Sequence, residues 1–167
     1  TNLDHPGSGG KHHDRKEDDQ LILIYNDQTS NLTEDLVKFF NGVIIDKNTL
    51  KIVCYTFDKC NEENSINPEF INNDVMIHPV YEGTLIRLFY YNNQWKLATK
   101  KMINAFNAKW ASEKSFGDMF VEIFGIENFN SDFIDSLGVN KNYCYSFLMG
   151  HNENNIIQNS HNYIIHL

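Results

Sequence analysis

The clearest structural signal in the chain is GTLIRLFYYNNQWKLAT, residues 83–99. Two runs of mainly β-branched, aromatic and other apolar residues, 83–91 and 94–99, flank the pair Asn92-Asn93. A two-residue type I′ turn requires positive φ at both central positions, and asparagine tolerates that conformation well. The stretch therefore predicts a β-hairpin. Because both faces of its first strand carry apolar groups, we expect that strand to lie in the centre of a sheet.

Shorter elements are expected before this hairpin. Residues 21–25, LILIY, predict a strand. Thr33 is the predicted N-cap of a helix with acidic residues in its first turn, and Gly42 is predicted to close that helix. The other elements expected here are a second hairpin over 43–46 and 50–57, and a short helical turn at Asn67-Pro68.

After the hairpin the helical signals become stronger. Residues 115–124 place Phe116, Met119 and Phe120 on one stripe, and Gly125 follows as a helix end. The remaining predicted elements are a helix over 101–110, a helix over 131–137 capped by Ser131 and closed by Gly138, and strands over 143–149, 156–157 and 163–167. This order of strands, hairpins and short helices predicts an α+β fold with a largely antiparallel sheet.

Composition limits the classes of protein to consider. Residues 1–20 hold almost no apolar side chain and read as a flexible tail or linker, so a single domain is expected over 21–167. The three histidines of this tail lack partners at a ligand-like spacing, so no metal site is predicted. The chain has three cysteines and no C-x-x-C, so we expect a reduced, intracellular protein. It has no apolar run of membrane length and no leader-like start, so we expect no contact with a membrane.

Charge is distributed unevenly along the chain. The net charge is −8, yet residues 87–114 carry six basic residues and one acidic residue. Phosphate contacts need a local positive potential, which an acidic chain supplies only in such a stretch. Two interpretations stay open: a solvated hairpin and helix surface, or a patch that faces phosphates.

Three blocks from residue 41 onward resemble the covalent nucleotidyltransferase superfamily of RNA and DNA ligases and mRNA capping guanylyltransferases. Residues 42–46 with 50–55 resemble the hairpin before the ligase active site. Residues 81–87 with 95–101 resemble motif I and its return strand, and 144–157 resemble motif III and the segment after it. The segment 104–120 resembles viral RNA-ligase-like members, as in giant viruses. The resemblance implies a ligase adenylation-domain (ATP-grasp-like) fold, in a truncated version, and a viral protein of the infected cytoplasm or the virion.

The same resemblance implies that catalysis has been lost. Members of the superfamily attack the α-phosphate of ATP or GTP with a lysine amine. The motif I lysine reads as Val80 here, the arginine of the hairpin block as Asn41, and the motif III glutamate as Leu148. The later acidic and basic motifs would fall beyond Leu167. We therefore assign no catalytic residue and no metal ligand; Mg²⁺ is expected only in an active enzyme.

Several retained residues fit a nucleotide- or RNA-binding role. A carboxylate accepts hydrogen bonds from base or ribose, glycine permits close approach, cations meet phosphates, and aromatic rings stack on bases. The predicted binding residues are Glu82, Gly83, Thr84, Arg87, Lys96, Lys100, Lys101 and Trp95. Tyr81, Phe89, Tyr90 and Trp110 are further stacking candidates, with core packing as the alternative. For Glu82 and Arg87 the alternative is a surface ion pair.

Three functions follow from these observations. The preferred one is a catalytically degenerate module that binds a nucleotide such as ATP or GTP, an RNA 5′ end or a cap-like group. The second is a protein-interaction or structural module on the same fold. The third is an active RNA ligase or guanylyltransferase with a displaced nucleophile, for which Lys96, Lys100 and Lys101 are the candidates.

Overall fold

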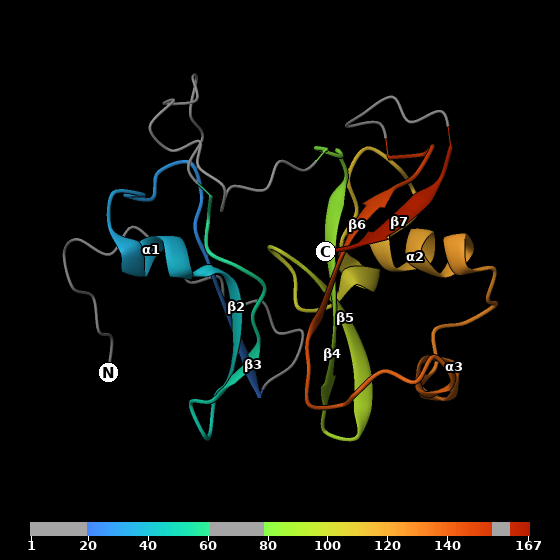
Figure 1. Cartoon of the computed structure of the whole chain (residues 1–167), viewed down its shortest axis with the longest axis horizontal. Helices are drawn as coiled ribbons and strands as arrows, with labels where there is room; N and C mark the ends of the chain where they lie inside the picture. The colour runs from blue at the N-terminus through green and yellow to red at the C-terminus, as the bar shows by residue number, and fades with distance from the viewer. Residues whose placement is uncertain (1–19, 61–78, 155–160) are drawn as a thin grey trace, which may run out of the picture.

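The computed structural model describes residues 20–60, 79–154 and 161–167. Within these ranges strands and short helices alternate along the chain (Figure 1). The elements are β1 (Leu21–Tyr25), α1 (Asp35–Phe39), β2 (Asn41–Asp46), β3 (Ile52–Cys54), β4 (Thr84–Tyr91), β5 (Gln94–Thr99), the 3-10 helix η2 (Ala105–Asn107), α2 (Phe116–Phe124), α3 (Ser131–Ser136), β6 (Tyr145–Gly150) and β7 (Tyr163–His166). The predicted α+β class with antiparallel pairing is confirmed.

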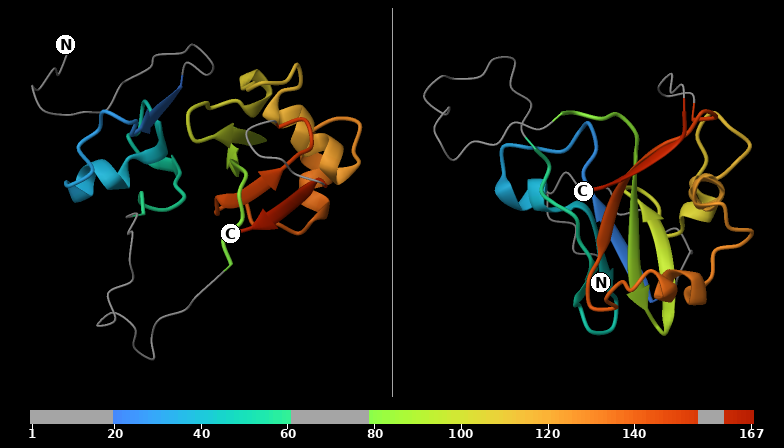
Figure 2. Two further views of the ribbon diagram at one scale, coloured as in Figure 1. Left: turned by 90° about the horizontal axis from the view of Figure 1, so that it is seen from above. Right: turned by 45° about the vertical axis from the view of Figure 1, so that its right-hand side comes forward.

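The strands form two antiparallel sheets. The N-terminal sheet has the order β1-β2-β3, and the C-terminal sheet has the order β5-β4-β6-β7. From above, β1 to β3 lie on one side of the molecule and the C-terminal sheet on the other (Figure 2, left), while α2 and α3 lie beyond that sheet (Figure 1). Side chains of β4 point to opposite faces of the sheet. Ile86 and Leu88 pack in the core between this sheet and the helices, and Phe89 packs in the core between this sheet and the N-terminal sheet.

The predicted central hairpin is confirmed in its strands and its turn. β4 pairs with β5 from Ile86 opposite Thr99 to Tyr91 opposite Gln94. Asn92 and Asn93 have φ of 49° and 59°, as a type I′ turn demands. β4 also pairs with β6, so it lies inside the sheet as expected. The strand over 21–25 is confirmed as well, and β2 pairs with β3 as expected, although β3 covers only Ile52–Cys54 of the predicted 50–57.

Helix α2 follows the sequence signals closely. Ser115 is its N-cap, and the reciprocal bonds between Ser115 and Asp118 form a capping box. Gly125 ends the helix in the left-handed conformation. For α3 the predicted cap was one residue off, because the side chain of Asn130, not Ser131, accepts the backbone N–H of Phe133.

The first predicted helix was wrong at both of its ends. Thr33 donates its hydroxyl to Asn31, and α1 begins after Glu34 instead. Gly42 does not end α1, since the helix closes at Phe40; Gly42 lies in β2 with φ of 95°, at a bulge opposite β1.

The helix expected over 101–110 shrinks to the three residues of η2. The side chain of Asn104 caps this turn, and Ala108 ends it in an extended conformation. The predicted features at 1–19, 67–68 and 156–157 lie outside the described residues.

Candidate functional site

A cavity of about 550 Å³ opens where the two sheets meet. Its wall combines β1 of the N-terminal sheet, the start of β4, the end of β5 and the segment before α2. The residues that bring polar, charged or aromatic groups to it include Tyr25, Thr84, Lys100, Lys101, Lys109 and Trp110. We call this space the lysine cavity. No aspartate or glutamate belongs to its lining within the described part of the chain.

Lys100 and Lys101 are placed by contacts with the N-terminal sheet side of the cavity. The ammonium group of Lys100 donates to Asn26 Oδ1 at 2.9 Å, and that of Lys101 lies 5.8 Å from the centre of the Tyr25 ring. Burial, followed by the positive charges of Lys59, Lys101 and Arg87, lowers the pKa of Lys100. Neighbouring cations that repel one another in this way form a site that an anion would stabilise.

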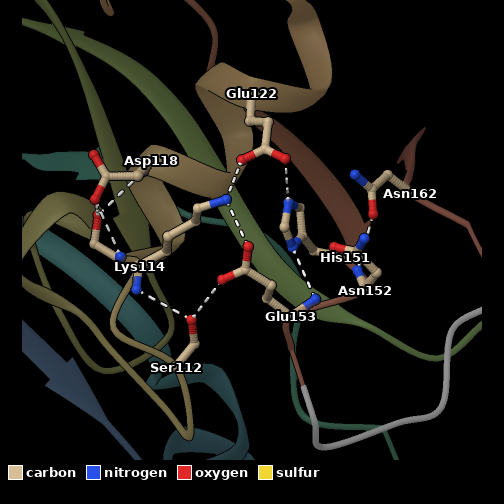
Figure 3. A network of polar contacts seen from close by, with 9 residues as sticks. Ser112, Lys114, Asp118, Glu122, His151, Asn152, Glu153 and Asn162 are labelled. Carbon is tan, nitrogen blue, oxygen red and sulfur yellow. Dashed lines mark hydrogen bonds and ion pairs between the residues drawn. The ribbon is translucent and has the colours of Figure 1, made fainter.

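Residues 112 and 114, which follow Lys109 and Trp110 in the chain, belong to a network of polar contacts (Figure 3). Lys114 lies 2.6 Å from Glu122 Oε2 on α2 and 2.6 Å from Glu153 Oε1 after β6. Ser112 donates its hydroxyl to Glu153 Oε2 at 3.2 Å. Trp110 itself is 63% exposed, so its ring is presented at the cavity instead of being packed in the core.

His151 completes this network from a fully buried position. Its Nδ1 accepts the backbone N–H of Glu153 at 3.1 Å, and its Nε2 lies 3.4 Å from Glu122 Oε1 (Figure 3). The largest cause that lowers the pKa of both Glu122 and Glu153 is the hydrogen bond each accepts from Lys114. The largest cause that raises the pKa of Lys114 is its hydrogen bond to Glu122. Sequence reasoning missed this network, because it counted Lys114 only among the charges of a stretch read either as a solvated surface or as a phosphate-facing patch.

Three of the predicted binding residues, Thr84, Lys100 and Lys101, line the lysine cavity together. Thr84 also accepts a hydrogen bond from the Asn154 side chain at 2.8 Å through its hydroxyl oxygen. These positions come from β4 and from the residues after β5, which the hairpin register brings side by side. Trp110, a predicted stacking candidate, also lines the cavity, and Lys109 adds a charge that the sequence placed only in a basic stretch.

Arg87 was predicted to bind phosphate, with a surface ion pair to Glu82 as the alternative; it is absent from the cavity lining, and the surface alternative is wrong because the side chain is buried. Its side chain is fully buried between the sheets. The guanidinium donates to the carbonyl of Gly42 in β2 and, at 2.6 Å, to that of Thr99 in β5. The β-bulge at Gly42 leaves that carbonyl out of the regular ladder, and Arg87 supplies its partner. A Cβ at Gly42 would lie 2.9 Å from the carbonyl oxygen of Lys100, so glycine also permits this close approach.

The other predicted binding residues lie away from the lysine cavity. Trp95 is 4% exposed, and its indole N–H donates to Asp135 Oδ1 at 2.8 Å, so it packs in the core. Lys96 lines a separate cavity of about 190 Å³. A Cβ at Gly83 would lie 2.6 Å from the carbonyl oxygen of Met149, so the pairing with β6 explains this glycine.

The residues at the motif I position are exposed. Val80 is 91% exposed and Tyr81 53% exposed. Glu82 is exposed, and its backbone carbonyl accepts the hydroxyl of Tyr163. None of these three belongs to the lining of the lysine cavity. Of the other stacking candidates, Phe89 is fully buried and Tyr90 packs beside the helices, as the core interpretation expected.

Comparison with known proteins gives two viral relatives. An immediate-early protein ICP-46 homolog of Invertebrate iridescent virus 6 is 42% identical over 96 residues, which is 52% of this chain and 21% of that protein. A homolog of the same name from Invertebrate iridescent virus 3 is 26% identical over 132 residues, 72% of this chain and 27% of that protein. The chain thus spans about a quarter of the length of the relatives it matches. The expected similarity to viral proteins is confirmed.

No protein-family model and no solved structure matches the chain. Among the described residues, no group of three or more histidine, cysteine, aspartate or glutamate side chains is arranged to hold a metal ion. Over the same ranges, no helix combines the length and the apolar character that crossing a bilayer requires.

Proposed function

We propose that this chain is a module that binds a nucleotide, an RNA 5′ end or a cap-like group in the lysine cavity. The fold behind this proposal is a catalytically degenerate relative of the RNA-ligase and capping-enzyme adenylation domain. The observation that carries it is the joint placement of Lys100, Lys101 and Lys109 around one cavity with an exposed Trp110 and no carboxylate in its described lining.

The chemistry of the cavity suits a phosphorylated ligand with a flat ring. Ammonium groups form charge-assisted hydrogen bonds with phosphate oxygens, and their mutual repulsion falls when an anion lies between them. An exposed indole is a platform for stacking on a base. A volume of about 550 Å³ lies within the ordinary range of small-molecule sites, roughly 300–1,000 Å³.

A covalent function has one observation in its favour. Lys100 lines the cavity, and its lowered pKa increases the fraction of neutral amine that can act as a nucleophile. An active enzyme with Lys100 in place of the motif I lysine is therefore the second candidate. Lys96, on its separate cavity, has no comparable support.

Two measurements on the full chain separate these candidates. Titration of GTP or ATP is expected to quench the fluorescence of exposed Trp110, while Trp95 stays buried. The Trp110→Phe variant is the matched control, since it should bind but lose the quenching. Incubation with α-labelled ATP or GTP and Mg²⁺ is expected to leave no label on the protein after denaturation.

Each outcome points to one function. A label that survives denaturation and disappears in Lys100→Gln would replace the binding module by the active enzyme. Absence of binding to nucleotide, cap analogue and 5′-triphosphate RNA would contradict the proposal and leave the protein-interaction or structural module.

By the name of its relatives, the chain is further proposed to belong to an immediate-early viral protein that acts in the infected cell or is packaged in the virion.

A further inference from the structure

Two cysteines that lie 90 positions apart in sequence meet at the interface of the sheets. The Sγ atoms of Cys54 and Cys144 are 2.9 Å apart. Cys54 is the last residue of β3 in the N-terminal sheet and is fully buried. Cys144 precedes β6 of the C-terminal sheet and is half-buried. Cys60, the third cysteine, is exposed and takes no part in this contact.

The surroundings of the pair favour one thiol as the nucleophile. The hydrogen bond between the two sulfurs is the largest influence on both thiols: it raises the pKa of Cys54 and lowers the pKa of Cys144. Burial raises the pKa of both thiols, and the positive charge of Arg87 lowers both. Cys144 is therefore the better thiolate, and it is also the thiol with access to solvent.

We propose that Cys54 and Cys144 are an oxidation-sensitive pair that closes into a disulfide between the two sheets. The sulfurs need to approach by less than about 1 Å to reach a bond length of about 2.05 Å. This proposal is independent of the function of the lysine cavity. It does concern the same interface, because the cavity takes its wall from both sheets.

The oxidant is a low-molecular-weight disulfide such as oxidised glutathione. The Cys144 thiolate attacks one sulfur of that disulfide, forms a mixed disulfide and releases one glutathione thiolate. Cys54 then gives up its proton and attacks the Cys144 sulfur, which releases the second glutathione. Two protein thiols become one disulfide, and one oxidised glutathione becomes two reduced molecules.

Closing so long a loop should raise the thermal midpoint of unfolding. A disulfide that joins residues 90 positions apart restricts the unfolded chain strongly, and for a chain of this size we expect a rise of about 10 °C. The Cys60→Ser variant should show the same rise, whereas Cys144→Ser should show none.

Peptide mapping of the oxidised full chain tests the proposal directly. Trypsin separates the three cysteines, since Cys54 lies in residues 52–59, Cys60 in 60–87 and Cys144 in 142–167. After exposure to oxidised glutathione, non-reducing mass spectrometry is expected to find 52–59 linked to 142–167, lighter by two hydrogen atoms than the reduced pair. Reduction should restore both free peptides.

Wild-type protein suffices for this test, so a variant that fails to fold does not affect it. The proposal is overturned if Cys54 and Cys144 stay open to alkylation after oxidation and denaturation, or if Cys144 links to 60–87 instead. An unchanged thermal midpoint in a fully cross-linked sample would overturn the claim that the bond ties the sheets.

Discussion

Arg87→Met separates the structural role of Arg87 from the phosphate-binding role that its sequence position indicated. Methionine is unbranched and apolar, so it keeps part of the buried aliphatic volume and removes both the charge and the donors. The guanidinium donates to Gly42 and Thr99 from a fully buried position. Each hydrogen bond from a charged donor contributes about 1.5–3 kcal/mol, so the two contribute about 3–6 kcal/mol.

Removing the buried charge returns part of this loss, because its own desolvation no longer opposes folding. The net destabilisation expected for Arg87→Met is therefore about 2–4 kcal/mol. Equilibrium unfolding in urea measures it as a lower midpoint with an unchanged slope. Arg87→Lys is the matched variant: it keeps the charge but cannot span both carbonyls with a planar fork, so it should also be destabilised.

Ligand affinity supplies the second readout on the same variant. Below the urea transition, Arg87→Met should bind nucleotide as the wild type does, since Arg87 is engaged between the sheets. A change in unfolding free energy below about 0.5 kcal/mol, together with a loss of nucleotide affinity, would refute the structural role and restore the phosphate-binding one.

Three further changes test other parts of the account. The hydrogen bond from the Tyr91 hydroxyl is the largest cause that lowers the pKa of Asp46 to about 2 from 3.8. Its stabilisation is therefore fully present above about pH 5 and is lost as the pH falls toward about 2. Urea midpoints across this window should fall more for wild type than for Asp46→Asn, and an equal fall in the two proteins would count against this effect. Gly83→Ala places a Cβ 2.6 Å from the Met149 carbonyl and should cost about 1–3 kcal/mol in urea unfolding, whereas a neutral effect would mean that β6 moves freely. Ser115→Ala removes the capping box of α2 and should cost about 1 kcal/mol in thermal unfolding, whereas Ser115→Thr keeps a hydroxyl that can bond Asp118 and should lose less.

Local signals predicted the elements whose partners lie nearby in sequence. The hairpin of β4 and β5 depends on its own turn asparagines, and α2 depends on a cap and an end within one segment. The helix expected over 101–110 failed because periodicity carries no information on the bridge between Thr99 and Met102, which turns the chain before η2.

The site was predicted only in part for a similar reason. Lys100 and Lys101 were identified from charge near the hairpin, and the cavity contains them. Arg87 was misjudged because a charged residue in a strand reads as exposed, while its acceptor at Gly42 lies 45 positions away. The ion pairs of Lys114 were not predicted because Glu153, which neutralises it, belongs to another segment. Long-range polar pairing leaves no periodic signal in the chain.

The most direct test of the lysine cavity is calorimetric titration of GTP and of a 5′-triphosphate RNA into four forms of the full chain. We predict saturable binding to wild type, and a loss of at least about tenfold in affinity for Lys100→Gln/Lys101→Gln, since each lysine–phosphate bond contributes about 1.5 kcal/mol or more. The control Lys47→Gln/Lys51→Gln removes the same charge from exposed positions on the β2–β3 turn and should bind as wild type does. Trp110→Ala should weaken binding through lost stacking. Equal affinity in both double variants, or no heat of binding for any form, would contradict the account.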